Sequence, residues 1–441
     1  MSEDQVKVEK VYQKVKDDLY LCRPDLRVGD KTYNAHLLFG LLTQLNNGTQ
    51  LAFGPYGGGK TTSATYLNSI LYGLPLKVVR GAIVRGNPQI TKQEVIGRPD
   101  YGKLNLGEEV ARWQKFCMIP PKIWDELPRT PESTQAIALA GIEEGSWTTL
   151  NEHIFEGRRP FYATANFADR GSNTIIPALL DRFDVATVVG FPGLVNARII
   201  SRRYNREQEK ILEEDQISEE AEKLLLTGNY NDVRKSFPQL RKSFLGVLSK
   251  RGMPVLTDED KERINKEIGE VKVGNQAEAY CTLLTSELNV HTQGDYLRNS
   301  LSQSCESRRL DQVVVRYAQS LAWLDGRNEV SLEDILNVAP YALWHRIDWK
   351  DTVKGRGKFA DYKGSDLDLK VTRAMLHEGS NGTKGLKTRL VENGANMEEL
   401  RKLIEKGDDE AAKKLLDSIT GTARTHPYFL DAKRELEDFL E

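Results

Sequence analysis

The sequence has few cysteines and few histidines. Its four cysteines, Cys22, Cys117, Cys281 and Cys305, lie far apart and form no C-x-x-C pair. The six histidines are equally scattered, and no two of them lie three or four residues apart. Structural zinc sites and disulfide frameworks need close spacings of these residue types, so the sequence predicts neither.

The sequence also lacks long apolar runs and a dominant charge. No apolar run reaches the ~20 residues that span a bilayer, and the acidic start MSEDQVKVEK has no apolar signal-peptide core. We therefore expect a cytoplasmic protein without membrane association. The formal net charge is only −2, so the chain as a whole gives no reason to expect nucleic-acid binding. Its 441 residues predict two or three domains.

Two helices and a strand are predicted before the first chemical motif. Apolar residues near the N-terminus recur every three or four positions, which predicts an amphipathic helix. They are Val8, Val11, Val15 and Leu19. A second helix through residues 33–45 is expected to end at the Asn-Asn-Gly that follows it. The run TQLAF, residues 49–53, has the length and composition of a strand.

The strongest signal is GPYGGGKTT, residues 54–62, which matches G-x-x-x-x-G-K-[ST] in full. Glycines in this pattern let backbone N–H groups surround a phosphate chain. Lys60 would reach the β- and γ-phosphates, and the Thr61 hydroxyl would bind Mg²⁺. The cofactors are therefore expected to be ATP and Mg²⁺. The residues expected to bind the nucleotide are Gly54, Pro55, Tyr56, Gly57, Gly58, Gly59, Lys60, Thr61 and Thr62.

A second acidic element follows a short apolar run, at Asp125 and Glu126. We expect Asp125 to contact the Mg²⁺ through its water shell, and Glu126 to orient or deprotonate the attacking water. The alternative is an acidic pair that opens a surface loop. Pro120 and Pro121 also weaken the strand assignment, unless they lie just before its start.

A strand predicted from Pro160 to Ala165 ends on a polar residue, Asn166. In sheets that carry a phosphate-binding loop, chemistry gathers at the carboxyl ends of the strands, where an amide can hold the attacking water. Asparagine at a strand end is also typical of a turn. The interpretation of Asn166 therefore depends on its place in the order of motifs.

Arg182 lies in the run PALLDRFD, between Asp181 and Asp184. One interpretation is a local ion pair at a helix end, with Asp181 or Asp184 as the partner. The other is an arginine that serves the active site of a neighbouring subunit. Only the rest of the chain can distinguish the two.

In this order the motifs resemble those of the AAA+ ATPases, and within them the MoxR group. The resemblance rests on GPYGGGKTT, WDELPRTPESTQAIALAGIEEG, ATAN and PALLDRFD, and it covers residues 33–204 and 306–347. Leu127 and Pro128 stand where the group usually has isoleucine and asparagine, and ATAN replaces the commoner ATQN. Neither departure removes a charged or water-orienting group.

The resemblance implies a role for each motif residue. Lys60 and Thr61 match the Walker A motif, with Thr61 as a ligand of the metal. Asp125, the second metal residue, and Glu126 match the Walker B motif. Asn166 matches sensor 1, which orients the attacking water.

Two arginines complete the implied catalytic set. Arg182 matches the arginine finger, which acts in the adjacent subunit's site. Arg309 aligns with the sensor 2 arginine, which reaches the γ-phosphate of its own subunit, and Arg308 is the alternative for this role. The residues assigned to catalysis are Glu126, Asn166, Arg182 and Arg309.

The implied fold class is α/β, an αβα sandwich with a mostly parallel sheet, followed by an α-helical lid and a helical C-terminal region. The expected domains are 1–191, 192–347 and 348–441. Within the lid, Ser331 and Asp334 have the spacing of a helix cap. Residues 348–366 are expected to form a linker, and the helices after it either a packing unit or a docking surface for a partner.

Two loops are candidates for substrate contact. Residues 78–93 carry Arg80, Arg85 and Lys92, and residues 143–159 are predicted to form a hairpin with Trp147. Aromatic and basic residues on projecting loops can grip a polypeptide or a nucleic acid. The alternative for each is a place in the core or at a sheet edge, which we favour for Trp147.

The resemblance implies a homo-oligomer, a hexameric ring, that couples Mg²⁺-dependent ATP hydrolysis to chaperone-like maturation of protein complexes. Members of the group often act beside a von Willebrand factor A domain protein. One alternative is a nucleic-acid motor, because LLDRFD also resembles the replicative minichromosome-maintenance helicases, although the near-neutral charge makes nucleic acid an unfavoured partner. Another is a nucleotide-gated scaffold, which would have no need of Glu126.

Overall fold

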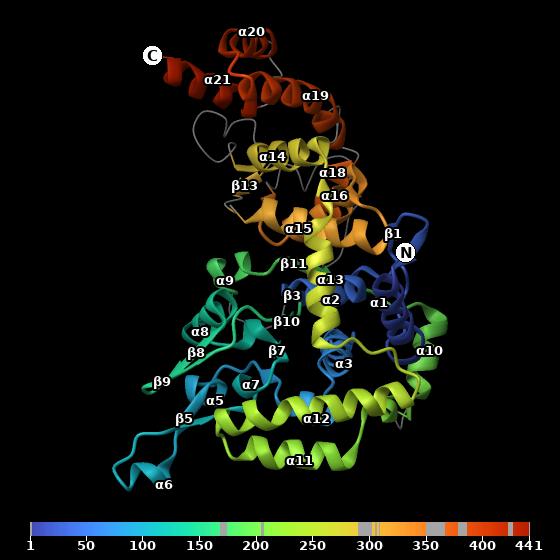
Figure 1. Ribbon diagram of the computed structural model, residues 1–441, viewed down its shortest axis with the longest axis vertical. Coiled ribbons are helices and arrows are strands. Elements are labelled where there is room, and N and C mark those ends of the chain that lie inside the picture. The colour runs from blue at the N-terminus through green and yellow to red at the C-terminus, as the bar shows by residue number, and fades with distance from the viewer. Residues whose placement is uncertain are drawn as a thin grey trace. The chain divides into compact units, whose positions relative to one another are not determined.

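A computed structural model describes most of the chain. The described residues are 2–167, 174–203, 207–289, 302–304, 307, 309–349, 367–377, 386–421 and 427–440. The chain divides into two compact units (Figure 1). The first comprises Met1–Glu267 with Leu324–Gly326, and the second comprises Ile268–Trp323 with Arg327–Glu441.

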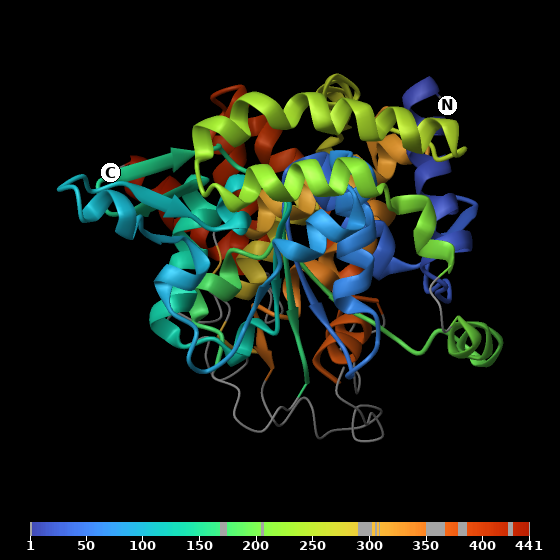
Figure 2. The ribbon, with the colours of Figure 1, turned by 90° about the horizontal axis from the view of Figure 1, so that it is seen from below.

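The first unit is built on a five-stranded sheet in which every pair of neighbours is parallel. In spatial order its strands are β11 (Val185–Val188), β3 (Thr49–Phe53), β10 (Phe161–Ala165), β7 (Lys122–Asp125) and β4 (Val84–Arg85). By position in the chain, this is the order 5-1-4-3-2. The central strands β3 and β10 are buried along almost their whole length, as in a sheet covered on both faces. Helices surround the sheet (Figure 2).

The N-terminal helices are where their apolar spacing predicts them. Helix α1 (Glu3–Lys14) begins with a capping box at Ser2 and continues as a π-turn (Val15–Leu19) that buries Val15. Helix α2 (Ala35–Asn46) ends at Asn47, which has a left-handed φ of 49°. Strand β3 follows, and its last residue leads into the glycine-rich loop, residues 54–59, which is the predicted phosphate-binding loop, and into helix α3 (Lys60–Tyr72). Both predicted helices and the predicted strand are confirmed.

Several short elements complete the α/β part. The helices are α4 (Leu76–Gly81), α5 (Lys92–Val95), α6 (Tyr101–Leu104), α7 (Lys115–Met118), α8 (Glu132–Glu144) and α9 (Pro177–Asp181). The antiparallel pairs are β1 (Leu26–Val28) with β2 (Lys31–Tyr33), β5 (Gly97–Pro99) with β6 (Ala111–Trp113), and β8 (Ser146–Thr149) with β9 (Glu152–Phe155). The pair β8–β9 is the predicted hairpin, and Trp147 on it is only 2% exposed, so its alternative as a core residue is the correct one.

Three helices and the greater part of a fourth, α13, close the first unit, whose main segment ends at Glu267. They are α10 (Leu194–Arg202), α11 (Asp215–Leu226), α12 (Tyr230–Lys250) and α13 (Asp258–Glu270). Helix α12 packs on α3 and α7 through a buried face that includes Phe244 and Leu248. The 3-10 turn Glu207–Leu212 contributes Glu209, which is buried and pairs with Arg80 at 2.8 Å. Arg80 is therefore engaged within the unit rather than presented on a projecting loop.

The second unit is mainly helical. Its helices are α14 (Asn275–Asn289), α15 (Leu310–Leu324), α16 (Leu332–Leu343), α18 (Leu367–His377), α19 (Leu386–Glu405), α20 (Asp409–Thr420) and α21 (Pro427–Leu440). Its strands are β12 (Lys272–Val273), β13 (Ser302–Ser304), β14 (Glu329–Val330) and β15 (Asp348–Trp349). The predicted cap of α16 is present as a capping box between Ser331 and Asp334. Most of the predicted linker, from residue 350 to 366, lies outside the described residues.

None of the helices that the structure describes is long and apolar enough to cross a membrane.

Candidate nucleotide site

The loop between β3 and α3 has the conformation that its glycines permit. Gly57 and Gly59 have φ values of 71° and 86°, a region that side chains with a Cβ rarely adopt. At Gly59 a Cβ would also lie 3.0 Å from a ring carbon of Tyr20. Gly59 precedes the first residue of α3, and no side chain caps that helix. The first N–H groups of α3 are thus directed at the loop, where they can bind an anion.

Lys60 links the loop to the end of a neighbouring strand. Its ammonium donates to the carbonyl oxygens of Gly54 at 2.8 Å and Pro55 at 2.9 Å, and to Asn166 Oδ1 at 2.7 Å. Burial lowers the pKa of Lys60, and the nearby Asp125 and Glu126 carboxylates oppose that shift. The ammonium therefore lies among five of the predicted site residues, where a phosphate can compete for it.

The two predicted metal residues are in direct contact. Thr61 Oγ1 donates to Asp125 Oδ1 at 2.5 Å, and Thr164 Oγ1 donates to the same oxygen at 2.6 Å. Asp125 is the last residue of β7, and Pro120 and Pro121 lie before that strand begins. Thr164 also accepts a hydrogen bond from the backbone N–H of Glu126 at 2.9 Å. Sequence reasoning had not singled out Thr164.

This donor set fits Mg²⁺. Hydroxyl and carboxylate oxygens are the ligands that Mg²⁺ prefers, and it normally keeps several waters and takes further oxygens from phosphates. No group of three His, Cys, Asp or Glu side chains able to hold a metal occurs among the described residues. Thr61 and Asp125 are the residues that would hold such an ion.

Glu126 is held between Asn166 and Arg129. Its φ of 53° places it in the left-handed region. Asn166 Nδ2 donates to its Oε1 at 3.5 Å, and Arg129 Nη1 pairs with its Oε2 at 3.0 Å. Arg129 Nη2 also donates to the Tyr56 hydroxyl in the phosphate-binding loop at 3.4 Å. The backbone turns so tightly here that a Cβ at Gly86 would lie 2.1 Å from the Glu126 carbonyl oxygen.

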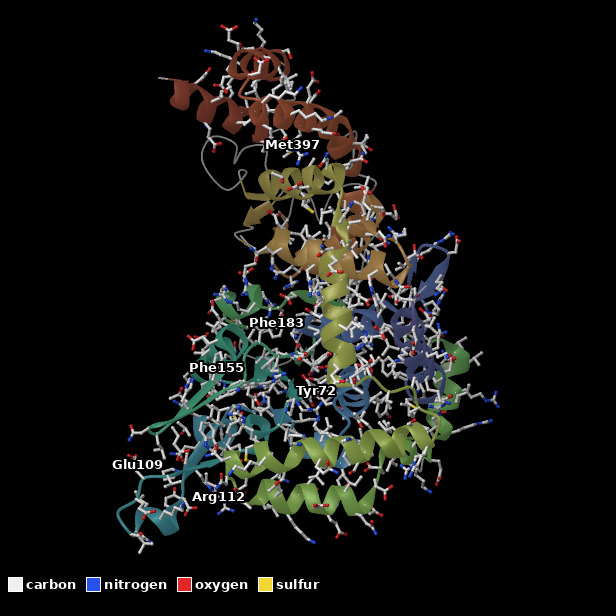
Figure 3. All side chains as sticks on the ribbon, in the orientation of Figure 1. Tyr72, Glu109, Arg112, Phe155, Phe183 and Met397 are labelled. Atoms are coloured by element: carbon white, nitrogen blue, oxygen red, sulfur yellow. The ribbon has the colours of Figure 1, made fainter. Side chains whose placement is uncertain are left out.

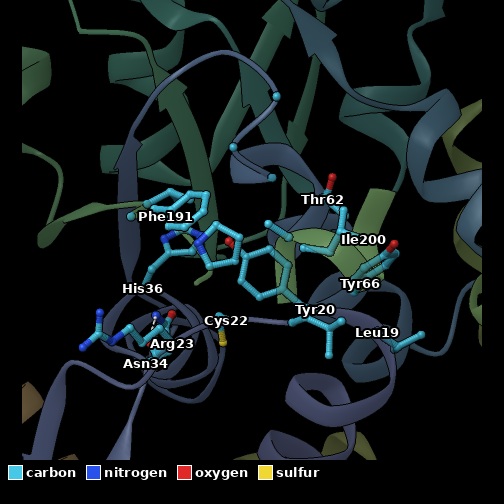
Figure 4. Close-up of a pocket in the computed structure, with 18 of the residues that line it drawn as sticks. Leu19, Tyr20, Cys22, Arg23, Asn34, His36, Thr62, Tyr66, Phe191 and Ile200 are labelled. Carbon is cyan, nitrogen blue, oxygen red and sulfur yellow. Dashed lines mark hydrogen bonds between the residues drawn. The ribbon is translucent and has the colours of Figure 1, made fainter. Parts of the chain in front are cut away.

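A cavity of about 900 Å³ adjoins the loop (Figure 4). Gly57, Gly58 and Gly59 form part of its wall. Figure 4 shows other lining side chains from widely separated segments, among them Tyr20, His36 and Phe191. Sequence reasoning did not find this cavity, because its wall is assembled from five separate segments that carry no shared pattern.

A chain of hydrogen bonds passes through His36, one of the residues that line the cavity. Gln50 Nε2 donates to Thr187 Oγ1 at 3.0 Å, and this hydroxyl lies 2.9 Å from His36 Nδ1. On the other side of the ring, His36 Nε2 lies 2.6 Å from Ser63 Oγ, which donates to the Lys60 carbonyl at 2.9 Å. Because Ser63 gives its hydrogen to that carbonyl, Nε2 of His36 donates and Nδ1 accepts.

The buried His36 is therefore neutral. Burial, and secondly the charge of Lys60, lowers the pKa of His36 to about 3. A neutral ring has one donor and one acceptor nitrogen, which is what the chain of hydrogen bonds requires. His36 thereby ties α2 to the first turn of α3 and to β11.

Arg182 lies at the end of α9 and on the surface of the first unit. Its guanidinium pairs with Glu143 of α8 at 2.8 Å and with Asp181 at 3.5 Å. Asp184 is not its partner, because that carboxylate accepts hydrogen bonds from Arg158 and from the backbone of Thr49. None of these bonds of Arg182 goes to the phosphate-binding loop.

Arg182 is anchored by its neighbour. The adjacent Phe183 is fully buried in the core (Figure 3), and the Arg182 carbonyl accepts a hydrogen bond from Thr49 Oγ1. The backbone position of Arg182 is therefore fixed by the burial of Phe183 and by this hydrogen bond.

Arg309 belongs to the second unit, where it immediately precedes α15. Its backbone N–H donates to Ser307 Oγ at 3.3 Å. Within the part of the chain that the structure describes, its Nη1 is buried without a hydrogen-bond partner. Its alternative, Arg308, lies outside the described residues.

Comparisons with known proteins bear on the fold. Residues 298–361 match the AAA lid domain family, a segment that contains Arg309, α15 and α16. A crystal structure of a protein from Cytophaga hutchinsonii, named as a candidate ATPase, is similar with a TM-score of 0.57 and 18% identity. That similarity covers 86% of this chain and 96% of the other. No curated protein matches the sequence.

Three observations agree with one another. They are the parallel sheet of order 5-1-4-3-2, the glycine-rich loop that follows β3, and the lid match. The chain therefore has the AAA+ fold, an αβα unit followed by a helical region with an AAA lid segment and a helical C-terminal region.

Proposed function

We propose that the protein binds ATP with Mg²⁺ and hydrolyses it. The observation that carries this proposal is the contact between Thr61 and Asp125, which brings the loop hydroxyl and the strand-end carboxylate together at 2.5 Å. Lys60, Glu126 and Asn166 lie around the same point. Residues from three separate strand ends thus converge at one edge of the sheet, where parallel α/β proteins bind ligands.

Each residue has a defined task in this proposal. Backbone N–H groups of the loop and the Lys60 ammonium bind the phosphates, and Thr61 and Asp125 hold the metal. Bound Mg²⁺ neutralises charge on the phosphate oxygens. Glu126 accepts a proton from the attacking water, and Asn166, within hydrogen-bond reach of Glu126, orients that water. Water then forms the new bond to the γ-phosphorus while the bond to the leaving ADP oxygen breaks.

The finer assignment rests on the sequence resemblance. We propose a MoxR-like ATPase that assembles as a homo-oligomeric, hexameric ring and matures protein complexes. A von Willebrand factor A domain protein is the proposed partner, and a binding assay tests it. Arg182 is the proposed finger in the adjacent subunit's site, and its place on the surface supports this role. Arg309 is the proposed sensor 2, supported by the lid match and by its buried Nη1.

We also propose a functional division at residues 191 and 347, into nucleotide domain, lid and C-terminal region. The lid match at 298–361 supports a lid in the middle region. The compact units divide at a different place, after Glu267, because α11 and α12 pack with α3, α4 and α7 of the first unit.

A glutamate substitution tests the proposed hydrolysis. Glu126→Gln should bind ATP about as tightly as the unaltered protein but hydrolyse it at least ~100-fold more slowly, because the amide cannot accept the proton. Lys60→Ala should weaken binding itself. The measurements are phosphate release and fluorescent-nucleotide binding, with the exposed Glu108→Gln as a matched control. Unchanged turnover in Glu126→Gln would remove the catalytic assignment.

The same assay separates the alternatives. Single-stranded DNA should leave turnover unchanged. A rise in turnover that weakens with added salt would favour the nucleic-acid motor. Bound ATP that does not turn over at all would favour the nucleotide-gated scaffold.

A further inference from the structure

Helices α11 and α12 lie in a part of the chain that neither the motifs nor the lid match covers. The resemblance to the AAA+ pattern ends at residue 204 and resumes at residue 306, and the lid match begins at residue 298. The two helices lie side by side on the first unit (Figure 1). Each packs one face against it, α11 on α4 and α7, and α12 on α3 and α7. Their other faces are exposed on helices that this packing holds in place.

The exposed face of α12 is basic. Its exposed cations are Arg234, Lys235, Lys242 and Lys250. None of the four forms an ion pair with a residue that the structure describes. Two other arginines of this segment do pair, Arg241 with Asp258 at 2.7 Å and Arg251 with Glu214 at 2.6 Å. The acid of α12 is Asp232 in its first turn, so the rest of the face carries positive charge alone.

The exposed face of α11 is mainly acidic. Its exposed carboxylates are Asp215, Glu219 and Glu220. No ion pair joins any of them to a described cation. Lys223 and Leu226, which is 60% exposed, lie towards the C-terminal end of the same helix. Opposite charges thus lie on neighbouring helices without pairing in one copy, so an outside partner can pair with them.

The ion pair between Arg251 and Glu214 fixes the direction of the two helices. Glu214 is the N-cap residue of α11, and Arg251 follows the last residue of α12. The helices are therefore antiparallel, and the N-terminal half of α11 lies beside the C-terminal half of α12. Glu219 and Glu220 belong to that half of α11, and Lys242 and Lys250 belong to that half of α12.

This arrangement is self-complementary under one kind of twofold rotation. An axis that runs along the helices, between them and in the plane of the exposed face, lays α11 of each copy on α12 of the other. Such a rotation leaves the position along the helices unchanged, so Glu219 and Glu220 come to face the partner's Lys242 and the partner's Lys250. A twofold axis across the helices would instead lay α12 on α12 and bring like charges together.

We propose that α11 and α12 form a twofold contact between two copies of this chain, in which the carboxylates of each α11 pair with the cations of the partner's α12. Helix α11 has only 12 residues and is about 18 Å long, so the contact is small and polar. The dimer should therefore be weak and sensitive to salt. Neither helix contributes a residue to the nucleotide site or to its cavity, so this contact is separate from the shared site proposed above.

Two charge-reversal variants test the contact. The α12 variant carries Lys242→Glu with Lys250→Glu, and the α11 variant carries Glu219→Lys with Glu220→Lys. All four positions are exposed, so folding should be retained, which circular dichroism and thermal unfolding will check.

The matched control is Lys92→Glu with Lys103→Glu, which makes the same charge change as the α12 variant at exposed lysines elsewhere in the first unit. Every protein carries Lys60→Ala and is studied without nucleotide, so that assembly driven by ATP does not contribute. The readout is the dissociation constant of the dimer, from sedimentation velocity over a range of concentrations.

The parent protein and the control should dimerise alike. Each reversal variant alone should dimerise at least ~10-fold more weakly, because both halves of the twofold contact then join like charges. An equimolar mixture of the two variants should regain the parent's dissociation constant, since each half again joins opposite charges. Raising NaCl from about 50 to about 500 mM should weaken the parent's dimer at least ~10-fold.

Other outcomes would overturn the twofold contact. These are a parent that is monomeric at every concentration, reversal variants that dimerise as the parent does, or a mixture that stays as weak as its components. A mixture that grows beyond two chains would replace the twofold contact with a head-to-tail one. Because no step of the measurement needs ATP, a failure of the proposed hydrolysis would leave this result unaffected.

Discussion

At the scale of single residues, Thr164 contacts both Asp125, the proposed metal residue, and Glu126, the proposed catalytic base. Its hydroxyl donates to Asp125 and accepts from the backbone N–H of Glu126. Thr164→Val keeps the volume of the side chain but removes both bonds. We expect ATP turnover to fall about tenfold, with ATP binding little changed, because Glu126 loses the contact that fixes its backbone.

Steady-state turnover against ATP concentration measures this effect. Thr148→Val, at an exposed threonine on β8, is the matched control and should leave kcat unchanged. A Thr164→Val protein with unaltered kcat would mean that the hydroxyl is dispensable for the site.

A pH dependence follows from His36. Its folded pKa of about 3 lies below the unfolded value near 6.5. As the pH falls below 6.5, the unfolded chain takes up a proton at this residue and the folded chain does not, so stability falls as the pH falls towards 3. The slope from this one group is at most about 1.4 kcal/mol per pH unit.

His36→Gln should remove that contribution. The free energy of unfolding of the variant should therefore vary less with pH between 7 and 4 than that of the unaltered protein, as measured by urea titration at each pH. The other histidines are common to both proteins, so the difference isolates His36. Parallel pH profiles would show that His36 is not a buried neutral ring.

Sequence reasoning reached the residues that carry a local pattern. Lys60 and Thr61 sit in a full loop motif, and the positions predicted for Asp125, Glu126 and Asn166 at strand ends are those that the structure brings together. Their catalytic roles stay predictions.

The residues that sequence reasoning missed are brought to the site by contacts between segments that lie far apart in the chain. Thr164 faces Asp125 because β10 pairs with β7, and His36 faces Ser63 because α2 and α3 lie against each other. Arg129 reaches Tyr56 across 73 residues of sequence. No spacing within one segment indicates such contacts.

At the scale of elements, the β8–β9 hairpin is fastened to α8 by Trp147. Its ring meets Phe116 edge-on at 5.3 Å between centroids, and a Cβ at Gly141 would lie 2.0 Å from it. The hairpin could be predicted from its sequence. A core or sheet-edge place for Trp147 is also favoured from the sequence, but its packing partner could not be predicted, because the pattern does not reveal that Gly141 on α8 leaves room for the indole.

A double-mutant cycle tests that packing. Trp147→Ala should destabilise the fold by about 3–5 kcal/mol through the cavity it leaves. Gly141→Ala should cost about 1–3 kcal/mol alone, because the ring must shift, and much less in the Trp147→Ala background. Chemical denaturation gives the free energies, and Phe155→Ala, at an exposed hairpin residue labelled in Figure 3, is the control. Additive effects would contradict the packing account.

At the scale of the whole molecule, the αβα fold could be predicted because the motifs, in their chain order, resemble those of AAA+ ATPases. The extent of the two compact units could not be predicted from the sequence. Helices α11 and α12 have the amphipathic pattern expected of a lid. Helix α12 nevertheless buries Phe244 and Leu248 and packs on α3 and α7, so it belongs to the first unit. Periodicity shows that a helix has an apolar face, and it does not show which neighbour covers that face.

The central claim for the whole molecule is a site shared between copies. Arg182→Ala should bind ATP but hydrolyse it far more slowly; in GTPases, loss of such an arginine costs ~10³–10⁵ in rate. Lys60→Ala should fail because its own phosphate-binding loop is disabled. Each variant therefore keeps the half of the site that the other has lost.

Mixing the two inactive variants is the most direct measurement. With mixed assembly verified by mass, ATP hydrolysis should recover, because Lys60→Ala subunits supply Arg182 to the intact loops of Arg182→Ala subunits. A mixed assembly that remains as inactive as its components would contradict the account and return Arg182 to a surface ion pair with Glu143 and Asp181.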